Sequence, residues 1–149
     1  MIETKKVLID SLEQTLETMA FLTIGPLEEN MSTPEKPVLA EISFTGPKSG
    51  TIQLLTDLDF CGILAENIGA LTETNEETCY DALKELSNVI SGLLLPVLSS
   101  SDAEVFDITI PTIKKGNDSP TWNEFIEQPD VNVLNVEGNL LAARLILND

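Results

Sequence analysis

The sequence predicts an α+β fold in which one mainly antiparallel sheet is covered by two long helices and a short one. Three segments carry apolar residues at helical spacing: residues 2–22, 57–71 and 75–99. Between and after them, strand patterns separated by short turn signals form two hairpins and one single strand. The length of 149 residues suits a single domain spanning 1–149.

The first helix is indicated by a stripe of large apolar side chains, and it ends before the Gly25-Pro26 pair. The stripe consists of Leu8, Leu12, Leu16 and Met19. A polar, proline-containing loop follows over residues 28–37, and then apolar and polar residues alternate as in a strand. The alternating apolar residues are Val38, Ala40, Ile42 and Phe44. The turn GPKSG and a second strand over Thr51–Thr56 complete the first hairpin.

The second and third helices each begin at a residue suited to helix capping. Asp57 or Asp59 can cap the short helix, and Thr74 or Asn75 the long one, which extends to about Ser99. Pro96 removes a backbone donor and predicts a kink near the end of the long helix.

The C-terminal part is predicted to contain three strands. Alternation over residues 105–111 indicates the first, and the connection KKGNDSPTWNEFIEQPD has the composition of a mobile surface loop with one helical turn around Trp122. Glu137-Gly138-Asn139 then separates two apolar strands, Val131–Val136 and Leu140–Leu147, in a second hairpin.

The charge of the chain excludes several classes of partner. With 25 acidic and eight basic residues the net charge is −17, so the backbone of a nucleic acid and anionic membranes are repelled. The longest apolar runs are too short to span a bilayer, and the N-terminus lacks the apolar stretch of a signal peptide. We therefore expect a cytoplasmic protein with no nucleic-acid or membrane partner.

The composition also limits the chemistry. The chain has no histidine, which excludes His-dependent zinc sites, triads with a His base and phosphohistidine transfer. Cys61 and Cys79 have no metal-ligand spacing, and we expect both to be buried reduced thiols.

One narrow polar stripe runs along the otherwise apolar third helix. At about 100° per residue, Asp81, Glu85, Asn88 and Gly92 project within roughly 60° of one another. The opposite side, expected to pack on the sheet, is formed by Leu83, Leu86, Ile90, Leu93 and Val97. Gly92 costs about 1 kcal/mol relative to alanine in a helix. The stripe is either an ordinary solvated helix face or a site for a partner.

The residues of this stripe also fit a longer pattern, Asp81-x3-Glu85-x2-Asn88-x22-Pro111. The pattern resembles the signature of the CheC/CheX/FliY family of chemotaxis phosphatases, and the predicted order of elements is similar to that family's fold over essentially the whole chain. CheC and FliY relatives carry two such sites. Glu85 is the only glutamate here with an asparagine three positions later, so the chain looks like the single-site CheX.

The resemblance implies a phosphatase acting on the phospho-aspartate of a CheY-like receiver domain. Asn88 would position the attacking water through its amide, and Glu85 would pair with the receiver's active-site lysine. Asp81 would support the interface or the helix, Gly92 would allow close approach, and Pro111 would shape the strand beside the site. No cofactor or metal of its own is implied, since Mg²⁺ belongs to the receiver.

Two other functions and one assembly state follow from these observations. One alternative is a non-catalytic module that keeps the family fold and binds receivers or a flagellar switch. The other, from a different class, is an acidic cation-binding or structural domain whose carboxylates hold calcium, although EF-hand spacing is absent. CheX relatives pair through their sheets, so we expect a homodimer, and the strand Leu140–Leu147 would be a suitable edge for it if that strand is exposed.

Overall fold

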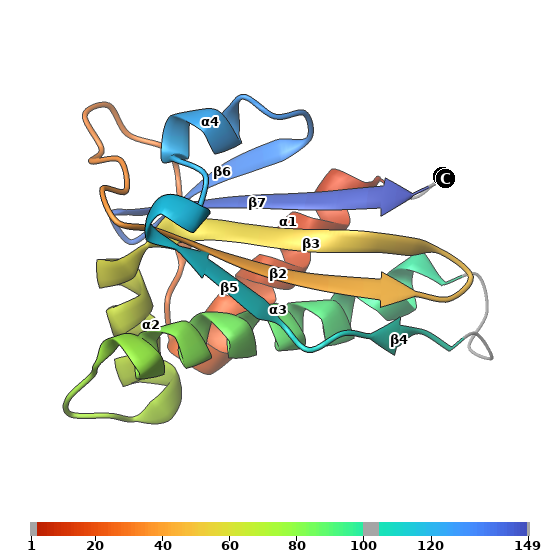
Figure 1. The fold of residues 1–149 in the computed structure, drawn as a ribbon, viewed down its shortest axis with the longest axis horizontal. Coiled ribbons are helices and arrows are strands. Elements are labelled where there is room, and N and C mark those ends of the chain that lie inside the picture. The colour runs from red at the N-terminus through yellow and green to blue at the C-terminus, as the bar shows by residue number, and fades with distance from the viewer. Residues whose placement is uncertain (1–2, 100–104, 149) are drawn as a thin grey trace.

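A computed structural model describes residues 3–99 and 105–148, and it places a single antiparallel sheet against a layer of helices (Figure 1). The order of strands in the sheet is β1-β6-β7-β3-β2-β4, and β5 also pairs with β2. The strands are β1 Ile24–Gly25, β2 Pro37–Thr45, β3 Ser49–Asp57, β4 Asp107–Ile108, β5 Thr112–Lys115, β6 Val131–Val136 and β7 Asn139–Asn148. All pairs are antiparallel, so the α+β prediction is confirmed.

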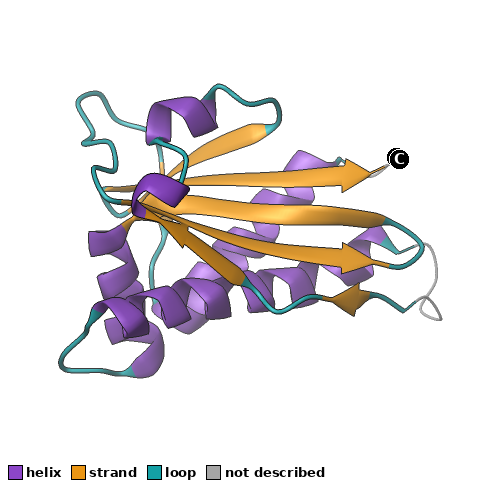
Figure 2. Ribbon diagram, viewed as in Figure 1, coloured by secondary structure: helices purple, strands orange, loops and turns teal. Residues whose placement is uncertain are grey.

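The three longer helices lie on one face of the sheet, and a short one lies on the other (Figure 2). The helices are α1 Thr4–Thr15, its π-helical continuation η1 Leu16–Ala20, α2 Leu58–Gly69, α3 Glu76–Leu98, the 3-10 turn η2 Gly116–Asp118 and α4 Trp122–Ile126. The main core lies between the long helices and the sheet. The stripe of the first helix enters this core, with Leu8, Leu12 and Leu16 fully buried and Met19 partly buried.

The predicted caps and the first hairpin are confirmed. Asp57 accepts a hydrogen bond from the backbone N–H of Asp59 at the start of α2. Asn75 and Thr78 form a capping box at the start of α3, in which each side chain accepts from the other residue's backbone N–H. The helix α3 continues through Pro96 to Leu98.

The strand predicted over 105–111 is interrupted, and the interruption has a local cause. Phe44 pairs with Ile108 and Glu41 pairs with Thr112, so the three residues 109–111 lie opposite only two residues of β2. Such an extra residue is a bulge, and Pro111 has no N–H with which to continue the ladder. One predicted strand is therefore two short ones, β4 and β5.

The segment after β5 is held on the outer face of the sheet. Trp122 and Phe125 are buried there in a second apolar cluster with Leu39, Leu55, Leu140 and Ala142. The helical turn around Trp122 is confirmed as α4, with a capping box formed by Thr121 and Glu124. The middle of this segment is therefore packed on the sheet, contrary to the surface loop that its composition suggested.

Two further expectations were wrong. Leu140–Leu147 is not an edge strand, because β7 lies between β3 and β6 and pairs with both. Val97 does not face the core, because its side chain is 49% exposed, and Leu93 is only partly buried. The buried positions at this end of α3 are instead Leu94, Leu95 and Leu98.

Candidate functional site on helix α3

The inner side of α3 fixes the position of the helix. Leu83, Leu86 and Ile90 are fully buried, and the helix contacts α1, α2 and the inner face of β2 and β3. At the N-terminal half, the ammonium group of Lys115 on β5 lies 4.5 Å from the centroid of the Tyr80 ring. This cation–π contact joins α3 to the edge of the sheet.

The outer side of α3 carries the predicted stripe. Asp81, Glu85, Asn88 and Gly92 are all exposed, so the structure brings these four residues together on one outward-facing side. Asp81 forms an ion pair with Lys84 on its own helix, with an N–O distance of 3.8 Å. Within residues 3–99 and 105–148, the side chains of Glu85 and Asn88 make no hydrogen bond or ion pair with another residue. A carboxylate and a carboxamide one turn apart are thus free to bind an external group.

Pro111, the fifth predicted site residue, lies on the edge of the sheet and not on α3. It is buried at the bulge between β4 and β5, and β5 contacts α3. Its position is that of a residue that shapes the edge of the sheet.

A hollow of about 320 Å³, which no sequence pattern indicated, adjoins the C-terminal end of the stripe. Its lining includes Gly92, Leu95 and Pro96 from α3 together with Phe106 and Ile108. Phe106 packs edge-on against Phe44, with 6.1 Å between the ring centroids. The alternation over residues 105–111 indicated a strand, but only the pairing of β4 with β2 places Phe106 and Ile108 beside α3.

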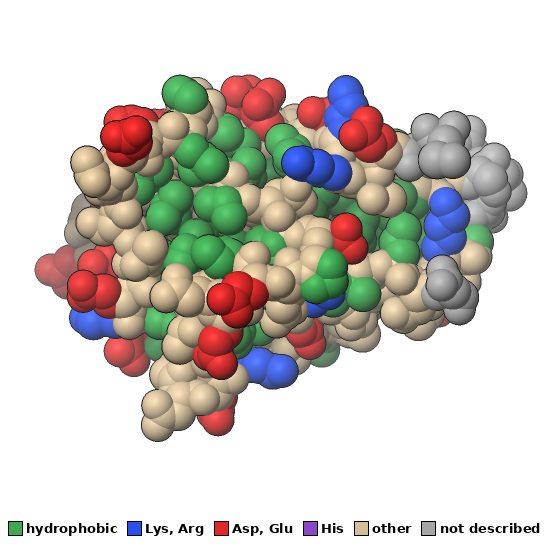
Figure 3. Space-filling view, turned by 90° about the horizontal axis from the view of Figure 1, so that it is seen from above, with side chains coloured by type: hydrophobic (Ala, Val, Ile, Leu, Met, Phe, Trp, Pro, Cys, Tyr) green, Lys and Arg blue, Asp and Glu red, His purple; other side chains and the backbone are tan. Residues whose placement is uncertain are grey.

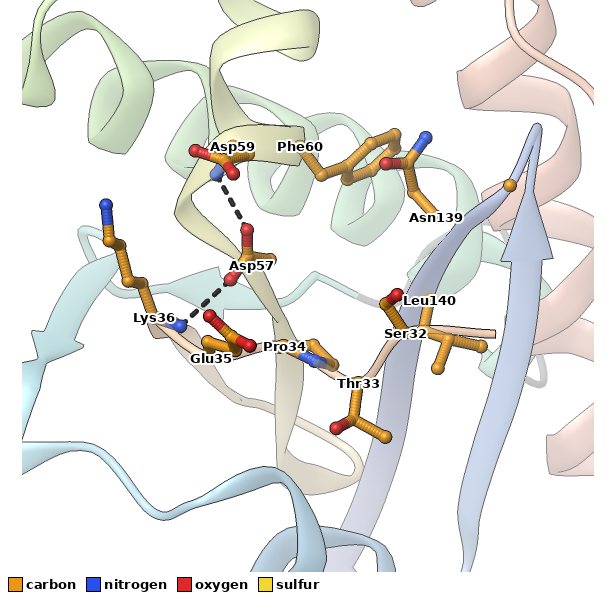
Figure 4. Close-up of a pocket in the computed structure, with 11 residues that line it drawn as sticks. Ser32, Thr33, Pro34, Glu35, Lys36, Asp57, Asp59, Phe60, Asn139 and Leu140 are labelled. Carbon is orange, nitrogen blue, oxygen red and sulfur yellow. Dashed lines mark hydrogen bonds between the residues drawn. The ribbon is translucent and has the colours of Figure 1, made fainter. Parts of the chain in front are cut away.

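A second hollow, shown in Figure 4, lies at the start of α2 and is remote in sequence from the stripe. It is lined by the loop 32–36, the ends of β3 and β7, and the first residues of α2. The Asp57 carboxylate at its centre already accepts from the backbone N–H groups of Lys36 and Asp59. These hydrogen bonds give Asp57 a structural role at the helix start.

The described part of the chain holds no cluster of side chains suited to a metal ion. Across residues 3–99 and 105–148, no three or more His, Cys, Asp or Glu side chains cluster closely enough to hold a metal ion. Cys61 and Cys79 are buried and free, as expected. Burial raises the pKa of the Cys61 thiol, with a further contribution from nearby Cys79, and burial also raises the pKa of Cys79.

No helix among the described residues combines the length and apolar composition that a membrane crossing requires.

The face that carries α4 and β6 groups hydrophobic side chains together, with acidic side chains mainly around them (Figure 3). These features do not add a second polar site to the one on α3.

Comparison with known proteins identifies the family. The sequence profile described as "Chemotaxis phosphatase CheX" matches residues 38–124, which is more than half of the chain and includes all five predicted site residues. The chain belongs to the CheX family. No protein among those with curated functions matches the sequence of this CheX-family chain.

Solved structures show the same fold over the whole chain. A chemotaxis protein CheX from Desulfovibrio desulfuricans superposes with a TM-score of 0.74 at 20% identity, covering 99% of this chain and 100% of that one. A CheX from Borrelia burgdorferi, determined in a CheX-CheY-BeF3-Mg²⁺ complex, gives a TM-score of 0.66 at 20% identity over 100% of both chains. FliY from Thermotoga maritima is less similar, with a TM-score of 0.59 at 16% identity, covering 96% of this chain and 85% of FliY.

Proposed function

We propose that this CheX-family protein dephosphorylates the phospho-aspartate of a CheY-like receiver domain. The observation that supports the proposal is the exposure of Glu85 and Asn88, side by side on α3 and without a partner in the described part of the chain. Both lie within the segment matched by the family profile. The Borrelia burgdorferi relative, which has this fold, was solved in complex with CheY.

In the proposed reaction, water attacks the phosphorus atom and the bond between phosphorus and the aspartate oxygen breaks. Inorganic phosphate leaves and the receiver recovers a free aspartate carboxylate. Such a transfer requires the attacking and leaving oxygens in line, and its catalysis is mostly positioning and charge stabilisation.

Asn88 is the residue that we assign to the water. Its carbonyl oxygen can accept from the water while its NH2 group donates to the phosphoryl oxygens. The amide has no titratable proton in the working range, so Asn88 acts as a positioning group and not as a general base. The receiver supplies Mg²⁺ and a lysine, which neutralise the phosphoryl group.

Glu85 is the residue that we assign to docking. It is one turn before Asn88, so both side chains face one patch of the partner. An ion pair between Glu85 and the receiver lysine would fix the register in which Asn88 enters the receiver's active site. Asp81 and Pro111 support this arrangement, Asp81 through the helix and Pro111 through the edge of the sheet.

The test is the lifetime of a phosphorylated CheY-like receiver with and without the protein. We expect wild type to shorten it, and Glu85→Ala and Asn88→Ala each to lower the effect at least about tenfold, the scale of a lost positioning group. Matched controls are Glu13→Ala on α1 and Asn123→Ala on α4, which are exposed helical residues of the same types. Equal rates for wild type and both site variants remove the enzymatic proposal, and a receiver that binds without faster hydrolysis leaves the non-catalytic binding module.

We also propose that the protein forms a homodimer through its sheet, with β6 in place of the strand expected from the sequence. In the described part of the sheet, β1 covers only Asn135 and Val136 of β6, so Val131–Leu134 presents an open edge. Light scattering at micromolar concentration should give twice the monomer mass. A monomer at every concentration contradicts this proposal.

A further inference from the structure

Gly92 lies one turn after Asn88 on the exposed side of α3, where the fold itself does not require a glycine. Only Gly46, Gly116 and Gly138 among the eight glycines have positive φ, so the backbone of Gly92 suits any residue. Among residues 3–99 and 105–148, and apart from its chain neighbours and the adjacent helix backbone, no atom would lie within 4 Å of a Cβ at Gly92. A glycine in a helix interior is destabilising relative to alanine, so this position has a cost that no described contact offsets.

Gly50, in contrast to Gly92, is at a position where the fold requires a glycine. A Cβ there would lie 2.2 Å from the carbonyl oxygen of Ile146 on the neighbouring strand β7. The close approach of two strands explains Gly50. No described residue approaches Gly92 in this way, so the described part of the fold does not account for a glycine there.

The short side chain of Asn88 indicates that a receiver bound at this residue also comes close to Gly92. The carboxamide carbon of asparagine is only two bonds from Cα, so a phosphoryl group that binds Asn88 must come close to the backbone of α3. Residues four apart rise about 6 Å along the helix, which places Gly92 under the same partner surface. A side chain at Gly92 would hold that surface away from Asn88, and the adjoining hollow gives room for a partner loop.

We infer that Gly92 is a contact residue over which the main chain of the bound receiver passes within van der Waals distance. The inference rests on the proposed function for the identity of the partner. It assigns the receiver interface an extent beyond Glu85 and Asn88, along α3 toward the hollow beside Phe106 and Ile108.

The experiment measures stability and receiver binding in the same set of variants. The variants are Gly92→Ala and Gly92→Leu, since a Cβ at this position meets no described atom within 4 Å and an open hollow adjoins it. Gly62→Ala on α2 is the control, because its Cβ would make ordinary contacts of 3.7 Å with the Cys79 sulfur and 3.8 Å with the Thr74 hydroxyl oxygen. The probe is a CheY-like receiver carrying beryllofluoride and Mg²⁺, titrated against each variant at fixed salt concentration.

We expect both alanine variants to raise Tm by about 1–4 °C, since each removes a helical glycine. Receiver affinity should fall about threefold for Gly92→Ala and at least about tenfold for Gly92→Leu, as overlap with a packed surface grows. Gly62→Ala should bind as wild type does. Equal receiver affinity for wild type and Gly92→Leu overturns the inference.

The outcomes separate this inference from the proposed function. Hydrolysis by wild type together with unchanged binding by Gly92→Leu removes the inference and leaves the phosphatase. A receiver that binds wild type without being hydrolysed, and binds Gly92→Leu at least tenfold more weakly, removes the phosphatase and supports the inference. Failure of wild type to bind any phosphorylated receiver removes both.

Discussion

The inner and outer sides of α3 both carry polar side chains, but the inner serines have hydrogen-bond partners within the helix, whereas Glu85 and Asn88 on the outer side have no described partner. Ser87 is buried and donates to the Leu83 carbonyl at 3.0 Å, and Ser91 is buried and donates to the Ser87 carbonyl at 2.9 Å. Glu85 and Asn88 stand on the same turns of the helix, exposed and without a described partner. A buried hydroxyl can be satisfied by its own helix, whereas a free carboxylate and carboxamide are available to a second protein.

Substitutions on the inner and outer sides of α3 should differ most in their effect on the free energy of unfolding. Leu86 is fully buried, so Leu86→Ala removes packed atoms and leaves a cavity, and we expect the free energy of unfolding to fall by about 2–5 kcal/mol. Asn88→Ala, two residues later, should change it by less than about 0.5 kcal/mol. Denaturant unfolding of the two variants measures both values. A loss of several kcal/mol in Asn88→Ala would mean that Asn88 serves the fold.

The rate at which a thiol is alkylated gives a second comparison between buried positions and the exposed side of α3. Burial raises the pKa of Cys79 on the inner side of α3 and of nearby Cys61 on α2, so less of the reactive thiolate is present and access is blocked. A cysteine introduced on the outer side by Asn88→Cys should react with an alkylating reagent at least about 100-fold faster than either native thiol. Mass spectrometry over time gives the three rates, and urea-unfolded protein is the control. Comparable rates in the folded protein contradict the burial of the native thiols.

Much of this contrast was predictable because it depends on local periodicity. The stripe from Asp81 to Gly92 and the cap at Asn75 are fixed by spacing along one helix, and both are found as predicted. The buried positions near the C-terminal end of α3 were predicted less well. A repeat through Leu93 and Val97 averages 3.5 residues, whereas a straight helix drifts by about 20° per heptad, which moves burial to Leu94 and Leu98.

The remaining errors concern contacts between distant parts of the chain. The bulge at 109–111 exists because β4 and β5 both pair with β2, and the sequence of the strand does not contain that register. The central place of β7 and the burial of Trp122 likewise depend on the order of strands in the sheet. The hollow beside Gly92 was missed for the same reason, since residues from α3 and from the segment 106–108 form it.

The salt dependence of KM should differ between variants of Glu85, which is charged, and of Asn88, which is neutral. The chain has a net charge of −17, and in the proposed complex Glu85 faces a receiver lysine. Screening weakens such attraction, so KM for the phosphorylated receiver should rise about threefold to tenfold between 50 and 500 mM NaCl. Glu85→Gln, which removes the charge and keeps the shape, should show a weaker dependence, while Asn88→Ala keeps the wild-type slope. Identical slopes for wild type and Glu85→Gln contradict the role of Glu85 in docking.

Asp81 gives the smallest effect, because it is the one polar residue of the stripe that the helix itself engages. Its ion pair with Lys84 spans 3.8 Å between side chains that are 63% and 37% exposed, and exposed pairs of this kind contribute less than about 1 kcal/mol. We expect Asp81→Asn and Lys84→Met each to change the free energy of unfolding by under about 0.5 kcal/mol, with a coupling of similar size in the double variant. If Asp81 serves the helix and not the phosphoryl group, kcat of Asp81→Asn stays within about twofold of wild type while Asn88→Ala loses at least about tenfold. A loss in Asp81→Asn as large as that in Asn88→Ala would extend the reacting part of the stripe by two turns toward the N-terminus of α3.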